Sequence, residues 1–268
     1  MMRLIALIAL CLCTTTQAVA DEALQKAIQD NVYRSEREIA RDIYRHPYET
    51  LSFFGIKPDM MVAEIQPGGG WYTNILAPYL KEDGSYIAVN YSPNLMQDPQ
   101  RRQAYQRWGE LFTADEEKFG PHAKTAFMGG GSLIAEANSL DMILTMREWH
   151  NYIASGLANV LAHEFFRVLK PGGVLGVVQH RANPKNPTRF GQNTGYVRED
   201  YLINVMEGAG FKLEAKSEIN ANPRDTADWP RGVWTLPPSL ALRDENRDFY
   251  LDIGESDRMT LKFVKPER

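Results

Sequence analysis

The chain has 268 residues, of which 44% are hydrophobic and 24% charged, and its formal net charge is −4 at pH 7. This composition is typical of a globular protein, and the length suffices for one α/β domain with a full core. The chain has no basic tract, which argues against a nucleic-acid partner. Beyond the first twenty residues it has no apolar run long enough for a membrane span.

The first twenty residues have the pattern of a secretory signal peptide. A short charged start precedes an apolar core over residues 4–12, and the small residues at 18 and 20 form a cleavage signal before Asp21. Both cysteines, Cys11 and Cys13, lie inside this segment. We therefore predict an exported, periplasmic protein that begins at Asp21 and has neither a disulfide nor a thiolate metal site.

Residues 21–57 are expected to form a helical extension before the main domain, which we place at residues 58–268. Apolar residues recur at roughly helical spacing between residues 21 and 45, which predicts one helix over that range. The helix should end at His46, because the residue before a proline avoids the α region. Residues 48–54 then lead into the first strand.

A strand, a glycine-rich turn and a helix follow one another near residue 65. The apolar run at residues 61–65 contains Glu64, the turn contains Gly68, Gly69 and Gly70, and a helical pattern begins at Thr73. Glycines let the backbone pass close to a ligand, and the helix N-terminus offers unpaired N–H groups. Glu64 can accept hydrogen bonds from ligand hydroxyl or amino groups. This order therefore predicts a small-ligand cradle.

Two further strands are predicted to end close to the cradle. The strand at residues 85–90 ends at Asn90 and is followed by Tyr91, whose ring can stack on a base or simply pack. The strand at residues 124–128 runs into the three glycines at 129–131.

A cluster of titratable and aromatic residues follows the strand predicted at residues 139–145. It contains Arg147, Glu148, Trp149, His150 and Tyr152. Open α/β sheets place their sites at the carboxyl ends of central strands. The next strand, at residues 174–179, delivers His180 to the same edge.

His150 is the candidate for proton transfer, since an unperturbed imidazole titrates near neutrality. Glu148 can orient His150 or act as the base itself. Alternatively, Glu148 pairs with Arg147 at the surface and Trp149 packs in the core. The five histidines lack a short metal-ligand spacing, so no metal site is predicted.

The glycine stretch resembles motif I of the class I S-adenosylmethionine-dependent methyltransferases, which is acidic-x-Gly-x-Gly-x-Gly. Glu64, Gly68 and Gly70 match this motif, whereas Gln66 stands where the first glycine is usual. The Leu-Lys-Pro-Gly-Gly turn at residues 169–173 is also similar to this family. So is the Ala-Gly-Phe entry to the strand predicted after residue 210.

The resemblance implies a Rossmann-like, doubly wound sheet of seven strands, mostly parallel with an antiparallel last strand. It also implies that S-adenosylmethionine binds in the cradle, on residues Glu64, Gln66, Gly68, Gly69, Gly70, Asn90 and Tyr91. In this family an acidic residue usually stands at the position of Asn90 and holds the ribose hydroxyls. A neutral amide there predicts weak binding of the cofactor.

The predicted function is methyl transfer to an unknown small-molecule acceptor, with His150 or Glu148 as a base. The alternative is an exported ligand-binding protein that keeps the fold without catalysis, because Gln66, Asn90 and the glycines at 129–131 depart from the usual cofactor contacts. A nicotinamide-dependent oxidoreductase is less consistent with the sequence, since its Gly-x-Gly-x-x-Gly spacing is absent.

Residues 220–257 form a long insertion before the last strand, where the family typically has a short hairpin. Long segments of this kind are often lids or binding loops. We therefore predict that Trp229 or Trp234 covers the site near His150. A packed surface excursion is the alternative.

Overall fold

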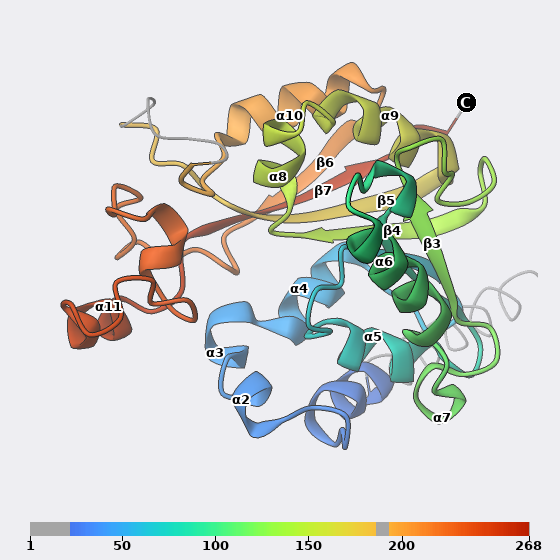
Figure 1. Cartoon of the computed structure of the whole chain (residues 1–268), viewed down its shortest axis with the longest axis horizontal. Helices are drawn as coiled ribbons and strands as arrows, with labels where there is room; N and C mark the ends of the chain where they lie inside the picture. The colour runs from blue at the N-terminus through green and yellow to red at the C-terminus, as the bar shows by residue number, and fades with distance from the viewer. Residues whose placement is uncertain (1–21, 186–192, 268) are drawn as a thin grey trace, which may run out of the picture.

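A computed structural model describes residues 22–185 and 193–267 of the chain (Figure 1). Its centre is one seven-stranded sheet with the spatial order β3-β2-β1-β4-β5-β7-β6. The strands are β1 Met61–Ile65, β2 Ser85–Tyr91, β3 Lys124–Met128, β4 Leu140–Met146, β5 Leu169–His180, β6 Lys212–Ser217 and β7 Arg258–Val264. Neighbouring strands from β3 to β5 are parallel, and β7 is antiparallel to both β5 and β6. The predicted sheet with its antiparallel last strand is confirmed.

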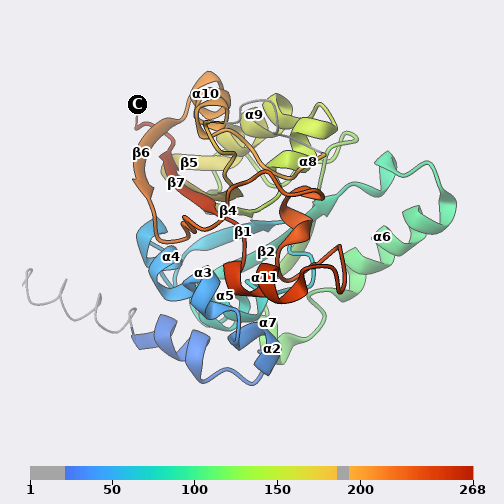
Figure 2. The same cartoon turned by 90° about the vertical axis from the view of Figure 1, so that its left-hand side faces the viewer.

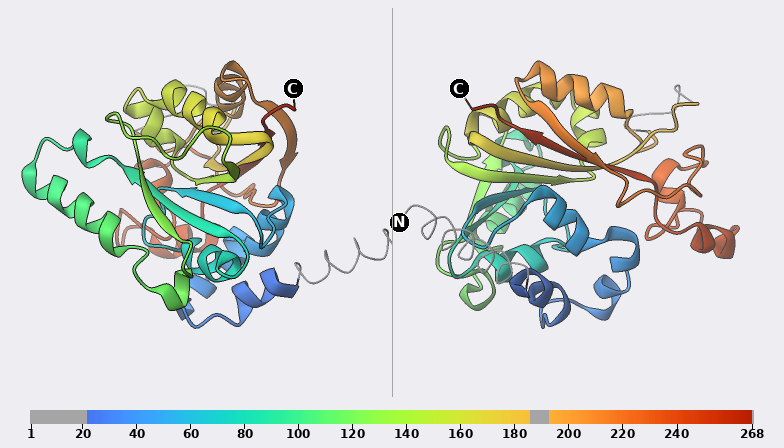
Figure 3. Two further views of the ribbon diagram at one scale, coloured as in Figure 1. Left: turned by 90° about the vertical axis from the view of Figure 1, so that its right-hand side faces the viewer. Right: turned by 180° about the vertical axis from the view of Figure 1, so that it is seen from behind.

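Helices cover both faces of the sheet (Figures 1 and 3). The helix at residues 22–29 precedes the others. The remaining helices are α2 Glu36–Ile39, α3 Asp42–Arg45, α4 Pro47–Phe54, α5 Thr73–Leu80, η1 Pro93–Leu95, α6 Pro99–Leu111, α7 Glu116–Phe119, α8 Trp149–Ala154, α9 Ala158–Val168, α10 Glu199–Gly208, η2 Gly232–Thr235 and α11 Arg247–Ile253. Helices α4 and α5 pack on one face, whereas α9 and α10 pack on the other.

Strand β1 divides its side chains between these two layers, because successive residues of a strand point to opposite faces. Ala63 and Ile65 join the cluster under α9 and α10, whereas Val62 joins the cluster under α4 and α5. Glu64 therefore points to the α5 side. Ile65 pairs with Thr145 of β4. The segments that follow β1 and β4 thus leave the sheet at the same level, and this position brings the candidate site together.

The prediction of one helix over residues 21–45 is wrong. The segment breaks into the helix at 22–29, α2 and α3, and Val32 of the predicted apolar stripe is 91% exposed. Two local hydrogen bonds favour the breaks. The Asn31 side chain accepts a bond from the Tyr33 backbone N–H at 2.9 Å. Ser35 then caps α2 in a reciprocal capping box with Glu38.

Residues 48–54 lead into β1 as part of α4, which begins at Pro47 because proline suits the first turn of a helix. Between β2 and β3 the chain forms three helices in turn, η1, α6 and α7. Asp98 and Asp115 cap the last two. Helix α6 has no fully buried residue, and Figure 2 shows it projecting from one side of the molecule.

The long segment at residues 220–257 builds its own small core beyond the end of the sheet, around Trp229 (Figures 1 and 3). The Trp229 ring lies 5.7 Å from that of Tyr250, and its indole N–H donates to the Asp225 carboxylate at 2.7 Å. This packed core includes η2 and α11, so the segment is structured rather than an open loop.

The contact between α4 and the sheet can be tested by mutation. Phe54 is fully buried, and a Cβ added to Gly176 of β5 would lie only 2.8 Å from its ring, so α4 packs directly on the strand. Phe54→Ala should lower the free energy of unfolding by about 3–5 kcal/mol, as measured by urea denaturation. Phe249→Ala, whose ring is 56% exposed, should cost less than about 1 kcal/mol. Equal losses in the two variants would contradict this packing.

Candidate functional site

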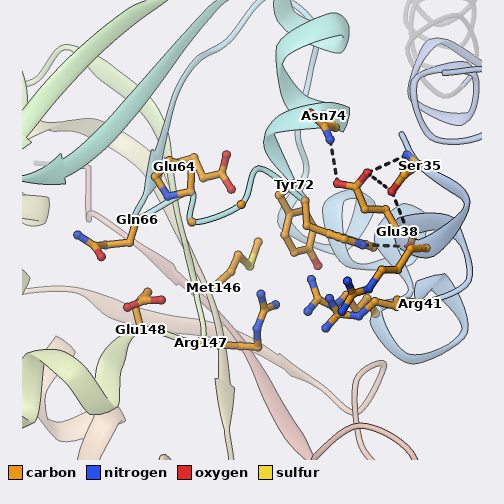
Figure 4. Close-up of a pocket in the computed structure, with 16 residues that line it drawn as sticks. Ser35, Glu38, Arg41, Glu64, Gln66, Tyr72, Asn74, Met146, Arg147 and Glu148 are labelled. Atoms are coloured by element: carbon orange, nitrogen blue, oxygen red, sulfur yellow. Dashed lines mark hydrogen bonds between the residues drawn. The ribbon is translucent and has the colours of Figure 1, made fainter. Parts of the chain in front are cut away.

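A cavity of about 550 Å³ lies at the carboxyl ends of β1 and β4 (Figure 4). Three parts of the chain meet there: residues 22–45, which we call the N-terminal segment, the glycine loop after β1, and the residues at the end of β4. The lining residues are Ser35, Arg37, Glu38, Arg41, Arg45, Glu64, Gln66, Pro67, Gly68, Gly69, Trp71, Tyr72, Asn74, Met146, Arg147 and Glu148. We call this the first cavity.

The glycine loop presents bare backbone to the first cavity. A Cβ added to Gly69 would meet no atom within 4 Å, so the space beside this residue is open. Gly68 lies at φ +57°, a left-handed conformation that suits glycine. Gly70 lies at φ +84° and turns the chain toward α5 without lining the cavity. Of the three predicted glycines, two therefore face the cavity.

Glu64 lines the first cavity with one carboxylate oxygen available. The side chain is 3% exposed, and it accepts two hydrogen bonds at Oε2: Thr73 Oγ1 donates at 2.7 Å and the Tyr86 hydroxyl at 2.6 Å. Among the described residues, no donor contacts Oε1. Burial raises the pKa of Glu64. The carboxyl group thus joins β1 to the start of α5 and keeps one acceptor for a ligand.

Gln66 and Asn90 bond to each other. Gln66 adopts φ +56°, and its Nε2 donates to Asn90 Oδ1 at 2.9 Å. The same oxygen accepts the Tyr91 backbone N–H at 2.8 Å. Neither Asn90 nor Tyr91 lines the first cavity, and the Tyr91 ring packs edge-on at 6.4 Å from that of Tyr152. The structure therefore brings Glu64, Gln66, Gly68 and Gly69 around one cavity but leaves Asn90 and Tyr91 outside it.

The N-terminal segment is held over the glycine loop by Glu38 (Figure 4). Its backbone carbonyl accepts the Trp71 indole N–H at 3.0 Å, and its Oε1 accepts from Asn74 Nδ2 at 2.8 Å. The Trp71 ring also lies 4.6 Å from the guanidinium carbon of Arg45, a cation–π contact. Sequence reasoning missed this role of the N-terminal segment. The Ser35-x-x-Glu38 capping box was the local signal that could have revealed α2.

A second cavity, of about 390 Å³, shares Arg41, Arg45, Arg147 and Glu148 with the first. Its further lining includes His150, His180 and Trp234. The ring of His150 lies 5.9 Å from that of His180 and 5.8 Å from that of Trp234. Strand β5 thus delivers His180 to the same edge of the sheet as His150, as expected. Trp234, and not Trp229, lies beside His150 and lines this cavity, whereas a covering role for it stays a prediction.

His150 is held by Gln179 in a defined orientation. The Gln179 Oε1 accepts the Trp149 backbone N–H at 3.0 Å, and its Nε2 donates to the Gly195 carbonyl at 3.1 Å. These two partners fix the amide, so the same Nε2 faces His150 Nδ1 at 3.4 Å as a donor. The contact is long, but it favours the tautomer with the proton on His150 Nε2.

Burial, and then the charge of Arg147, lower the pKa of His150 to about 4. This differs from the titration near neutrality that the sequence suggested. At neutral pH the ring is uncharged, and its Nε2–H is a hydrogen-bond donor. Burial, followed by the charge of Arg258, lowers the pKa of His180 as well.

Glu148 lines both cavities and is half-buried. Its Oε2 accepts a hydrogen bond from Asn151 Nδ2 at 2.8 Å. Within residues 22–185 and 193–267 it forms no hydrogen bond with His150 and no ion pair with Arg147, so neither expected pairing is seen. Burial raises the pKa of Glu148. Over the same residues, no group of three metal-ligating side chains lies close enough to hold an ion.

The lowered pKa of His150 makes stability depend on pH. Between the ordinary value of 6.5 and about 4, the unfolded chain binds a proton that the folded chain does not. Stability should therefore fall as pH falls through this window, with His150 contributing about 1.4 kcal/mol per pH unit. His150→Gln should make the slope shallower in urea denaturation at several pH values. His163→Gln, at an exposed position of α9, is the control. Equal slopes in wild type and His150→Gln would contradict this assignment.

No protein-family model matches the chain, and no curated protein matches it. Many solved structures are similar in fold. The [4+2]-cyclase SpnF has 17% identity and a TM-score of 0.53, over 88% of this chain and 84% of the cyclase. An S-adenosylmethionine-dependent methyltransferase from Methanosarcina mazei has 14% identity and a TM-score of 0.51, over 81% of this chain and 98% of that one.

A third similar structure is a complex between the Haloferax volcanii Trm112 methyltransferase activator and a methyltransferase. It has 15% identity and a TM-score of 0.51, over 87% of this chain and 94% of that one. At these identities the similarity establishes the fold, and the strand order with its antiparallel β7 agrees with it. The chain therefore has the fold of the class I S-adenosylmethionine-dependent methyltransferases.

Proposed function

We propose that the protein is an S-adenosylmethionine-dependent methyltransferase acting on a small-molecule acceptor. The observation that carries this proposal is the pair of cavities that meet at Arg147 and Glu148. The first lies over bare glycine backbone, and the second contains both histidines, His150 and His180. This arrangement suits a cofactor and an acceptor placed side by side, with the reacting atoms between them.

The residues of the first cavity fit the cofactor. The backbone at Gly68 and Gly69 faces open space, and Glu64 Oε1 is available to accept hydrogen bonds from an amino group. When bound there, S-adenosylmethionine supplies an electrophilic methyl group on its sulfonium. The N-terminal segment, held by Glu38, covers the same space and would exclude water from it.

Glu148 is the proposed base. It lines both cavities, and its raised pKa brings it closer to the pH at which it can take up a proton from an acceptor. His150, with its proton on Nε2, is proposed to orient the acceptor by donating a hydrogen bond. The predicted catalytic pair is thereby kept, with the two residues in different roles.

The second candidate function is a ligand-binding protein with this fold and without catalysis. The hydrogen bond between Gln66 and Asn90 favours it, because Asn90 Oδ1 already accepts two donors and stands where an acidic residue would hold the ribose hydroxyls in the family that the sequence resembles. A neighbour with this fold is described as a [4+2]-cyclase, so the fold alone does not decide the reaction.

We also propose that the protein is exported, to the periplasm. The support is the signal-peptide pattern over residues 1–20, which lie outside the described part of the chain. None of the helices described is long and apolar enough to cross a membrane.

Export predicts a defined mature protein. Intact-mass spectrometry of the periplasmic fraction should give a chain that begins at Asp21 and contains no disulfide, since Cys11 and Cys13 are removed with the leader. A protein that retains both cysteines would contradict this proposal.

Cofactor binding is testable at Gly69. Gly69→Leu places a side chain in the open space over the loop without a left-handed backbone, so the variant should fold. Calorimetry should show weak binding of S-adenosylmethionine and its demethylated product to wild type and at least tenfold weaker binding to Gly69→Leu. NAD should give no heat. Gly208→Leu, whose added side chain also meets open space, should bind like wild type.

The outcomes separate the candidate functions. Absence of heat for wild type at millimolar S-adenosylmethionine would overturn the methyltransferase proposal and favour a binding protein for another ligand. Equal affinities of wild type and Gly69→Leu would place the cofactor elsewhere.

A further inference from the structure

Four arginine side chains line the second cavity: Arg41, Arg45, Arg147 and Arg258. They come from the N-terminal segment, the end of β4 and the start of β7. Only two carboxylates, Glu148 and Glu255, line the same cavity. Four arginines against two carboxylates give the cavity an excess of positive charge, to which the two histidines add nothing at neutral pH because their pKa values are lowered.

Glu255 pairs with three of the four arginines. Its carboxylate accepts from Arg41 Nε at 2.6 Å and from Arg45 Nε at 3.3 Å, and it also pairs with Arg258. Arg147 is different. In the part of the chain that the structure describes, its side chain forms no hydrogen bond and no ion pair, although it lines both cavities. Figure 4 shows it pointing from the end of β4 toward the group that contains Arg41.

The other arginines also keep unused donors. Each of them has one buried nitrogen atom with no hydrogen-bond partner within the described part of the chain: Arg41 Nη2, Arg45 Nη1 and Arg258 Nε. A buried donor without a partner is costly, more so when it carries charge. Burial, together with the charge of Arg258, lowers the pKa of Arg147. The cluster is thus short of negative charge and of hydrogen-bond acceptors.

Arg147 is held in an unusual backbone conformation. Its φ is +66°, which is uncommon for a residue with a side chain, and its backbone N–H donates to the Val178 carbonyl at 2.7 Å. Residues kept in such conformations are concentrated at ligand sites. Here the conformation directs a long cationic side chain to the junction of the two cavities.

The remaining side chains of the second cavity suit an organic anion. His150 offers its Nε2–H as a neutral donor, and Trp234 and Val233 supply an apolar surface. Guanidinium groups match the planar geometry of carboxylates and also bind phosphates with two parallel hydrogen bonds. In a molecule that joins a carboxylate or phosphate to an apolar group, the anion would bind the arginines and His150, and the apolar group would pack on Trp234 and Val233.

We propose that this arginine cluster binds the anionic group, a carboxylate or a phosphate, of the molecule on which the protein acts. That the anion belongs to a methyl acceptor rests on the proposed function. The binding of an anion at Arg147 does not rest on it.

A structural explanation of the cluster makes a different prediction. If the arginines only joined the N-terminal segment to β7, Arg147 would contribute to stability. Since no described residue bonds to the Arg147 side chain, Arg147→Gln should instead unfold at the same temperature as wild type, or at a higher one, when no anion is added. The substitution relieves repulsion among like charges and leaves the Glu255 ion pairs intact.

The test measures anion binding without S-adenosylmethionine. Inorganic phosphate and benzoate are titrated into the mature protein at constant ionic strength, with chloride as the reference, and binding is followed by calorimetry and by tryptophan fluorescence. Wild type should bind at least one of the two, and the preferred anion tells phosphate from carboxylate. Arg147→Gln should bind at least tenfold more weakly, because a charged hydrogen bond is lost.

Two controls accompany the test. Arg147→Lys should recover part of the affinity, since it keeps the charge but not the planar fork. Arg198→Gln, which removes one charge from a partly exposed side chain that pairs with Asp200 and does not line the cavity, should bind like wild type.

Three results would overturn the proposal: no binding of either anion beyond chloride, equal binding by wild type and Arg147→Gln, or a lower unfolding temperature for anion-free Arg147→Gln. Anion binding without S-adenosylmethionine binding would leave the arginine site standing and reject methyl transfer. The two proposals therefore fail separately.

Discussion

The ion cluster around Glu255 determines how the N-terminal segment lies on the sheet. Burial alone would raise the pKa of Glu255, but the charges of Arg258, Arg45 and Arg41 hold it at about 2. The carboxylate is therefore ionised throughout the physiological range and joins residues that are more than 200 positions apart in the chain. Breaking a buried pair of this kind by removing one partner typically costs about 3–5 kcal/mol. The position of the N-terminal segment over the glycine loop therefore depends on the ion pairs of Glu255.

The same cluster explains why the site has two parts. Arg41 and Arg45, which bond to Glu255, line both cavities. Arg147 lines both as well, and its side chain has no bonded partner among the residues that the structure describes. On one side the chain offers backbone and a free carboxylate oxygen of Glu64. On the other it offers cations, a neutral histidine and the Trp234 ring. Because the two cavities differ in chemistry in this way, we interpret them as one binding site that holds two different molecules.

The sequence predicted those parts of the fold that depend on local patterns. Apolar runs gave the strands, and Gly68–Gly69 gave the loop between β1 and α5. The N-terminal segment could not be predicted in this way, because Val32 has helical spacing yet is exposed, and side-chain bonds at Asn31 and Ser35 interrupt the helix. Local hydrogen bonds there outweighed the apolar pattern.

The arginine cluster also escaped prediction, for a different reason. Its members are distant in sequence and are joined only by Glu255, which has no motif around it. The neutrality of His150 depends on burial and on Arg147, and its tautomer depends on Gln179, a residue of a neighbouring strand. Such properties arise from the packed structure, so the sequence could name His150 and Glu148 as candidates but not assign their roles.

The central claim is that the two cavities bind a cofactor and an anionic partner side by side. The most direct measurement is a crystal structure of the mature protein grown with the demethylated product of S-adenosylmethionine and with phosphate. The account predicts the amino-acid end of the product against Gly68, Gly69 and Glu64, and phosphate at Arg147. A structure with the product bound away from the glycine loop, or with side chains of the protein occupying the space beside the loop, would contradict it.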